Sequence, residues 1–289
     1  MRPLIIERLT DAGFGWLVGL IPTAGFLYVT LFVVLVGLFV KRSVDTLIPS
    51  AAALEAVFAG AVGAVVGHRL YFLVISGDIG RAQLSDWPRL ALGTASWGAY
   101  AGGIAGITIY GLLSARGATL PMLDVSGSCA GLGDVIGRMA CLMAGDDFGK
   151  VATVPWAIRF PAGSFPHTAH VESDLLDPAA SLSLPVHPFQ IYMTLNGLLV
   201  FLILTMVWRR ERARPGRTFA AFLLVYGGTR FWWEFLRHPD AGATGALSDS
   251  QWACVVFVVA GALMLLVLRR TVSLSAAKGI GIPIEPSKP

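Results

Sequence analysis

The stretch Ile21-Pro-Thr-Ala-Gly-Phe-Leu-Tyr-Val-Thr-Leu-Phe-Val-Val-Leu-Val-Gly-Leu-Phe-Val40 contains no charged residue, and Lys41 and Arg42 follow it directly. A helix needs roughly 20 mainly apolar residues to cross the hydrocarbon core of a bilayer. We therefore interpret residues 21–40 as a membrane-spanning helix.

The composition of the whole chain agrees with this interpretation. Of its 289 residues, 55% are hydrophobic and only 14% are charged, and the mean hydropathy is +0.69. A soluble globular domain has about 25% charged residues. A single water-soluble core cannot hold this excess of apolar side chains, so the composition excludes an ordinary soluble domain.

Further apolar segments of similar length follow along the chain. They cover residues 53–76, 92–113, 122–144, 188–207, 218–236 and 251–268. The segment 122–144 is the most polar, because Asp124, Asp134 and Arg138 interrupt it. We predict an all-α membrane bundle of about seven transmembrane helices.

The basic residues of the loops predict the orientation of these helices. The loops on the side of the C-terminus hold more Lys and Arg than those on the other side, and the run 208–217 contributes most. Cytoplasmic loops carry an excess of basic residues. The N-terminus is therefore predicted outside and the C-terminus in the cytoplasm. We interpret the basic run as an anchor facing anionic lipid and not as a nucleic-acid site.

The chain is predicted to form one transmembrane domain over residues 1–270, followed by a flexible cytoplasmic tail at 271–289. A short interfacial helix is possible at 11–20. The external loop 145–187 is rich in proline and acidic residues. Loops of this length are usually functional or disordered, and its aromatic content favours an ordered loop over the external mouth of the bundle.

The cysteines indicate neither a metal site nor a disulfide. Cys129, Cys141 and Cys254 all lie in apolar stretches without a CxxC or Cys/His ligand spacing. We interpret them as buried apolar residues and predict no metal site.

Arginines within the apolar segments are the first candidates for function. An arginine inside a bilayer usually faces a cavity, a partner or an anionic ligand. Arg230 and Glu234 are spaced i, i+4, so they can pair on one helix face, and Arg237 continues that face. The pair could simply fix helix packing. However, Glu234 can neutralise only one of the arginines, which also include Arg69 and Arg138. Because the planar guanidinium binds two phosphate oxygens at once, the set predicts a site for a phospholipid headgroup.

A second polar group lies at the predicted external start of the segment 188–207. His187, Gln190 and Tyr192 could bind a headgroup, and His187 could accept a proton because its ordinary pKa is near 6.5. An interfacial belt without chemistry explains these residues equally well. The glycines of 98–103 favour close helix packing over ligand binding.

Four stretches, in order, resemble the prolipoprotein diacylglyceryl transferase family. They are Gly67-His-Arg69-Leu-Tyr71; Gly137-Arg138 with Gly145 and Gly149-Lys150; Val154-Pro-Trp-Ala-Ile-Arg-Phe-Pro161 leading to His187-Pro-Phe-Gln190-Ile-Tyr192; and Arg230-Phe-Trp-Trp-Glu234-Phe-Leu-Arg237-His-Pro-Asp240. The resemblance extends from about residue 20 to 268, and the family's seven spans with an external N-terminus match the topology predicted above.

The resemblance implies a bacterial inner-membrane enzyme that uses no cofactor. Such an enzyme moves the diacylglyceryl group of phosphatidylglycerol onto the lipobox cysteine of a prolipoprotein signal peptide and releases glycerol-1-phosphate. It implies catalytic roles for Arg138, Arg230 and Glu234. From the residues themselves, we consider His187 or Tyr100 the candidate proton-handling group. The resemblance also implies a substrate-binding role for other residues, namely Arg69, Gly137, Asp146, Gln190, Tyr192 and Arg237.

The chain departs from the family's pattern around the thiol. The segment 96–103 lacks a histidine that the family's best-known form has before a Gly-Gly pair, and the two signature asparagines are replaced by Cys141 and Ala144. The alternative function is therefore a non-catalytic member that binds anionic lipid or lipoprotein precursors. A small transporter fits less well, because the sequence shows no repeated halves.

Overall fold

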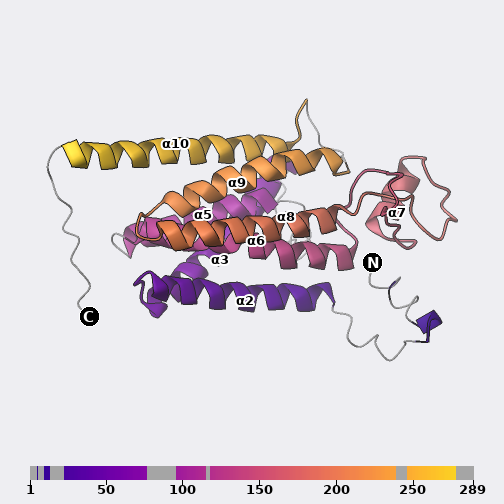
Figure 1. Cartoon of the computed structure of the whole chain (residues 1–289). Coiled ribbons are helices and arrows are strands. Elements are labelled where there is room, and N and C mark those ends of the chain that lie inside the picture. The colour runs from indigo at the N-terminus through magenta and orange to yellow at the C-terminus, as the bar shows by residue number, and fades with distance from the viewer. Residues whose placement is uncertain are drawn as a thin grey trace.

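The structure is a computed structural model that describes residue 5 and residues 10–13, 23–76, 96–114, 118–238 and 246–277. Long helices run side by side, alternately up and down, and form a bundle (Figure 1). In chain order they are α2 (Ala24–Asp45), α3 (Ser50–Ser76), α5 (Ser96–Leu113), α6 (Thr119–Ala144), α8 (Phe189–Glu211), α9 (Arg217–Trp233) and α10 (Asp249–Ala277). Within the described residues, each predicted apolar segment corresponds to one long helix, although the segment 218–236 extends beyond the end of α9.

The apolar surface of the bundle confirms a helical membrane protein. Within the described residues, four helical segments are long and apolar enough to cross a membrane, namely Gly25–Asp45, Ser50–Tyr71, Phe189–Glu211 and Asp249–Arg269. Large apolar side chains on these helices point outward, as with Phe58 at 71% exposure and Val256 at 63%. Such a surface suits lipid and not water. No strand occurs in the described part, where the only bridges are isolated ones. Three lie within the loop before α8, and the fourth joins Gly149 of that loop to Arg237 after α9.

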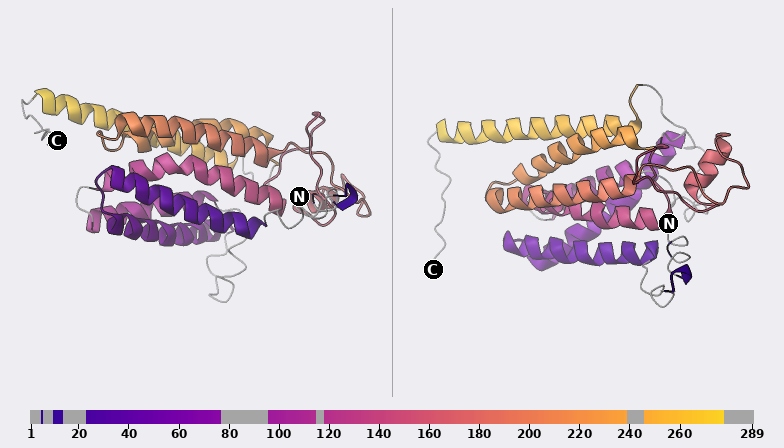
Figure 2. Two further views of the ribbon diagram at one scale, coloured as in Figure 1. Left: turned by 60° about the horizontal axis from the view of Figure 1, so that its bottom comes forward. Right: turned by 45° about the vertical axis from the view of Figure 1, so that its right-hand side comes forward.

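Helix α6 lies at the centre of the bundle and packs against α2, α5, α8 and α9 (Figures 1 and 2). Its polar residues, which weakened its prediction as a span, have partners inside the protein. The buried carboxylate of Asp124 accepts hydrogen bonds from the backbone N–H groups of Gly216 (2.6 Å) and Phe219 (2.7 Å). Asp124 therefore caps the N-terminus of α9, where the first N–H groups of a helix have no partner within the helix.

Glycines allow α3 and α5 to approach closely, as predicted for the segment 98–103. A Cβ atom added to Gly67 would lie 2.7 Å from the Cα atom of Gly102, and one added to Gly98 would lie 3.0 Å from the carbonyl carbon of Gly67. Small residues that let backbones approach are typical of helix contacts in membranes.

Replacement of Gly102 by leucine is expected to destabilise the bundle by about 1–3 kcal/mol, the usual cost of overpacking. The new side chain would collide with the backbone of α3. Gly37→Leu is the matched control, because a Cβ atom added at Gly37 meets nothing within 4 Å. Thermal unfolding in detergent should show a lower midpoint for Gly102→Leu alone, and equal midpoints would contradict the close contact.

The loop 145–187 is ordered and has its own small core, which agrees with the prediction of an ordered loop. Phe148, Phe160 and Val186 are buried together with Leu142 at the end of α6. The loop contains a short helix, α7 (Phe165–Glu172), that the sequence analysis did not predict. It lies at the same end of the bundle as the start of α2 and the end of α9 (Figure 1).

The structure bears differently on the two expectations about the chain ends. Helix α10 continues to Ala277, beyond the start of the tail predicted at residue 271. The interfacial helix predicted at 11–20 lies mostly outside the described residues.

Candidate active site

The ion pair predicted from the i, i+4 spacing of Arg230 and Glu234 is present. The guanidinium of Arg230 contacts the carboxylate of Glu234, and the two side chains are only 4% and 6% exposed. Arg230 also lies over the ring of Phe189 on α8, 5.3 Å from its centroid. Two helices therefore fix the position of this guanidinium.

Arg237 reaches the same carboxylate, although not from a continuous helix as predicted. Helix α9 ends at Trp233, a 3-10 turn covers Glu234–Leu236, and Arg237 itself has extended backbone. Its Nη1 lies 3.2 Å from Oε1 of Glu234, and its Nε lies 2.7 Å from Oδ1 of Asp147. Arg237 thus connects the end of α9 to the start of the loop 145–187.

Asp147 brings Arg138 into this network. The other carboxylate oxygen of Asp147 contacts Nη1 of Arg138, whose Nε lies 3.6 Å from Asp134 one helical turn earlier. Asp147 has a positive φ of 50°, which is uncommon for a residue with a side chain. The conformation turns its carboxylate between Arg138 and Arg237, so α6 and α9 share one polar centre.

The charge balance of this centre corrects the sequence analysis. We expected too few acids for the arginines, but Asp134, Asp147 and Glu234 oppose Arg138, Arg230 and Arg237 one for one. The network by itself is close to neutral. Each guanidinium has five N–H donors, and the ion pairs of Arg138 use Nε and Nη1, which leaves Nη2 for a ligand.

The hydroxyl of Tyr100 is influenced by the positive charges of both Arg138 and Arg230. Its hydroxyl donates to the hydroxyl of Tyr226 on α9 at 3.2 Å. The charges of Asp134, Arg138 and Arg230 act on both hydroxyl groups. The rest of the Tyr100 ring packs among aromatic residues. Tyr226 was not among the predicted site residues.

His187 and Tyr192 form a separate cluster toward the loop. Nδ1 of His187 lies 3.2 Å from the Tyr192 hydroxyl, which accepts a hydrogen bond from the Trp156 indole at 2.6 Å. The Tyr192 ring stacks on Trp233, with 5.4 Å between centroids. Gln190 is buried and donates to the backbone carbonyl of Asp146 at 2.6 Å. These residues join the start of α8 to the loop and the end of α9.

The remaining predicted site residues lie on α3, on α6 and in the loop that follows α6. Arg69 is half-buried on α3, and Gly137 is half-buried on α6, where an added Cβ atom would come no closer than 3.9 Å to Leu31 of α2. Among the described ion pairs, the arginines contact the carboxylate of Asp147 and not that of Asp146. Sulfur of Cys141 lies 3.8 Å from the hydroxyl of Tyr28.

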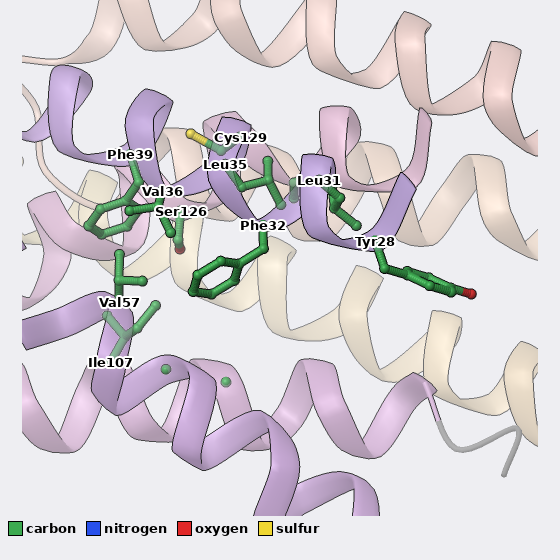
Figure 3. Close-up of a pocket in the computed structure, with 13 residues that line it drawn as sticks. Tyr28, Leu31, Phe32, Leu35, Val36, Phe39, Val57, Ile107, Ser126 and Cys129 are labelled. Carbon is green, nitrogen blue, oxygen red and sulfur yellow. The ribbon is translucent and has the colours of Figure 1, made fainter. Parts of the chain in front are cut away.

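An apolar groove begins at Tyr28 and runs along the bundle. It has a volume of about 460 Å³ and lies between α2, α3, α5 and α6. In Figure 3 the Tyr28 side chain lies at one end, and Phe39, Val57 and Ile107 lie at the other. Ser126 and Cys129 add its few polar atoms. The contact of Tyr28 with Cys141, one turn from Arg138, places the polar centre beside the groove's end.

Comparison with known proteins identifies the family. A model of the family described as prolipoprotein diacylglyceryl transferase matches residues 18–267. The chain belongs to this family. Curated relatives named phosphatidylglycerol–prolipoprotein diacylglyceryl transferase include one from Paracidovorax citrulli, which is 33% identical over 75% of this chain and 76% of its own length. Others are those of Methylobacillus flagellatus, 33% identical over 75% and 78%, and Chromobacterium violaceum, 31% identical over 73% and 78%.

Two of the acidic residues that hold the arginines of this centre, Asp134 and Asp147, were not predicted from the sequence. Asp146 was assigned to the site because of the family signature, whereas Asp147 is the residue that joins Arg138 to Arg237. The ion pair of Asp134 with Arg138 could have been predicted, because these residues have the same i, i+4 spacing as Arg230 and Glu234. No local pattern pointed to Asp147.

His170 of α7 predicts that the stability of the loop 145–187 depends on pH. Its side chain is completely buried against Phe148 and His238, and its ring nitrogens have no hydrogen-bond partner among the described residues. Burial, followed by the charges of His238 and His167, lowers the pKa of His170 below its ordinary value of 6.5. The unfolded loop therefore takes up a proton more readily than the folded one, so stability is complete above about pH 6.5 and falls below it.

We expect limited proteolysis to cut within residues 145–187 faster at pH 5.5 than at pH 7.5, with a protease active at both values. His170→Phe keeps a buried ring and removes the titrating group. A variant with the same pH dependence as the wild type would show that His170 is not responsible.

Proposed function

We propose that this chain transfers the diacylglyceryl group of phosphatidylglycerol to the lipobox cysteine of prolipoproteins. The observation that carries the proposal is the meeting of Arg138 and Arg230 in one centre beside an apolar groove. Membership of the family, and the names of its relatives, support the same reaction.

The reaction forms a bond between the cysteine sulfur and the glycerol carbon next to the phosphate. The C–O bond to the phosphate breaks, and glycerol-1-phosphate leaves with the bonding electrons. Preorganised donors stabilise charge that develops on departing oxygens. We assign this role to Arg138 and Arg230, held in place by Asp134, Asp147 and Glu234, with Arg69 and Arg237 at the edge of the site.

The thiol proton must leave for the thiolate to attack. His187 and Tyr100 are the candidate proton-handling groups. Tyr100 lies within reach of the arginine charges, and His187 lies nearer the loop, in contact with Tyr192. The apolar groove suits one acyl chain of the donor lipid, and Gly137 keeps its wall near Leu31 open.

We further propose that the seven long helices all span the inner membrane, with the N-terminus outside. The three helices that are shorter or more polar, α5, α6 and α9, pack inside the bundle against other helices. The polar centre and the loop 145–187 then lie toward the external side, where a secreted preprotein would arrive.

Purified protein in detergent should release glycerol-1-phosphate from phosphatidylglycerol when it is given a lipobox peptide. The same peptide with serine in place of cysteine is the control and should give no release. Binding of lipid without any product under these conditions would contradict the transfer reaction and favour a non-catalytic lipid-binding protein.

A further inference from the structure

A charged cavity lies at the opposite end of the bundle from the candidate active site. It has a volume of about 420 Å³ and lies between the last turns of α2 and α8. Its lining consists of Leu38, Lys41, Arg42, Asp45, Trp208, Arg209 and Arg212. Four basic side chains thus face one carboxylate, so the cavity has the charge of an anion-binding site.

Arg42 forms the fixed wall of this cavity. It is 5% exposed, although it lies just beyond the predicted span 21–40. Its guanidinium donates to the carbonyl of Ser128 (2.9 Å) and the hydroxyl of Thr205 (2.8 Å) and lies 5.0 Å from the ring centroid of Trp208. The like charge of Arg209 acts on it as well. Burial beside a like charge is unfavourable, and a bound anion would relieve it.

Two further features indicate that the cavity binds an anion. Among the described residues, no ion pair joins Lys41, Arg209 or Arg212 to a carboxylate. Trp208 is 5% exposed, and its indole N–H is buried without a hydrogen-bond partner. Buried N–H groups nearly always have a partner, and an oxygen of a ligand in the cavity would supply one.

The surfaces next to the cavity indicate that this anion belongs to a lipid. Met206 and Leu202 precede Arg209 by one and two turns on the same face of α8, and they are 52% and 51% exposed. Val34 precedes Lys41 by two turns on the same face of α2, and it is 40% exposed. On both helices, exposed apolar side chains therefore lead along one face to a basic residue. A phospholipid requires this arrangement, because its acyl chains contact the apolar residues and its headgroup contacts the basic ones.

We propose that the cavity binds the phosphate of an anionic phospholipid in the cytoplasmic leaflet. Basic pockets between transmembrane helices on this side bind such headgroups. The site is separate from the transfer reaction and uses neither Arg138 nor Arg230. Its occupant would hold α2, which lines the acyl groove, against α8.

The test measures binding of phosphatidic acid to the delipidated full chain in neutral detergent by native mass spectrometry. The variant Arg209→Gln with Arg212→Gln removes two charges from the cavity. Its matched control is Arg210→Gln with Arg214→Gln, which removes two charges from the same helix end but outside the cavity; all four arginines are exposed. We expect about tenfold weaker binding or more for the cavity variant only.

Equal loss in both double variants, or no loss in the cavity variant, would overturn the proposal. Binding of inorganic phosphate with the affinity of phosphatidic acid would overturn the assignment to a lipid. Arg138→Gln should keep a molecule of phosphatidic acid bound, whether or not the protein transfers diacylglyceryl groups. Loss of all bound lipid in Arg138→Gln would place the lipid in the other site and refute the proposal.

Discussion

Arg138→Gln is expected to lower the rate of diacylglyceryl transfer by at least about 100-fold, the usual effect of removing one donor that stabilises developing charge. The substitution removes the positive charge on α6 and leaves Asp134 and Asp147 without their common partner. The departing phosphate would then meet two carboxylates on this side of the site, and only Arg237, which pairs with Asp147, would remain to balance them.

The variant Arg138→Lys shows whether the positive charge of Arg138 or the planar shape of its guanidinium supports the transfer rate. Lysine keeps the charge but cannot contact Asp134 and Asp147 through a planar fork. We expect a partial loss of activity for lysine and a nearly complete loss for glutamine. Arg159→Gln is the control, because Arg159 is exposed in the loop. Release of glycerol-1-phosphate at the wild-type rate by Arg138→Gln would exclude Arg138 from the chemistry.

Glu234→Gln is expected to destabilise the protein by about 3–5 kcal/mol, because it removes one partner of a buried ion pair. The carboxylate of Glu234 holds Arg230 and Arg237 together and accepts from the hydroxyl of Ser248 at 3.4 Å. Glutamine keeps the shape but leaves Arg230 as an uncompensated buried charge over Phe189.

The unfolding midpoint in detergent and the transfer rate should both fall for Glu234→Gln. Glu172→Gln is the matched control, because Glu172 lies exposed on α7. A double variant that also carries Arg230→Gln should recover part of the lost stability, since no buried charge then remains unpaired, but it should recover no activity. Wild-type stability of Glu234→Gln would show that the pair does not hold α9 in place.

The sequence predicts the helices and local pairs of this protein well, because both depend on spacing along the chain. The length of apolar segments such as 21–40 indicates each helix, and i, i+4 spacing indicates the contact of Arg230 with Glu234. The end of α9 was less predictable. Pro239 disfavours a helical conformation just before it, and the chain tightens to a 3-10 turn at 234–236.

Contacts between distant segments could not be predicted in this way. Asp147 follows α6 in a loop, and only the folded loop turns it between Arg138 and Arg237. A count of charges along the helices therefore gave an excess of arginine that the folded centre does not have. Similarly, no local pattern indicated that Arg42 turns inward, because its partner Thr205 lies on another helix.

Complementation of a bacterium depleted of its own transferase tests the central claim most directly. We expect this chain to restore growth and the lipid modification of lipoproteins. An Arg138→Gln, Arg230→Gln double variant present in the membrane at the same level should restore neither. Modified lipoproteins in cells that carry only the double variant would contradict the proposed role of the arginine centre, and a wild-type chain that restores nothing would contradict the transfer reaction itself.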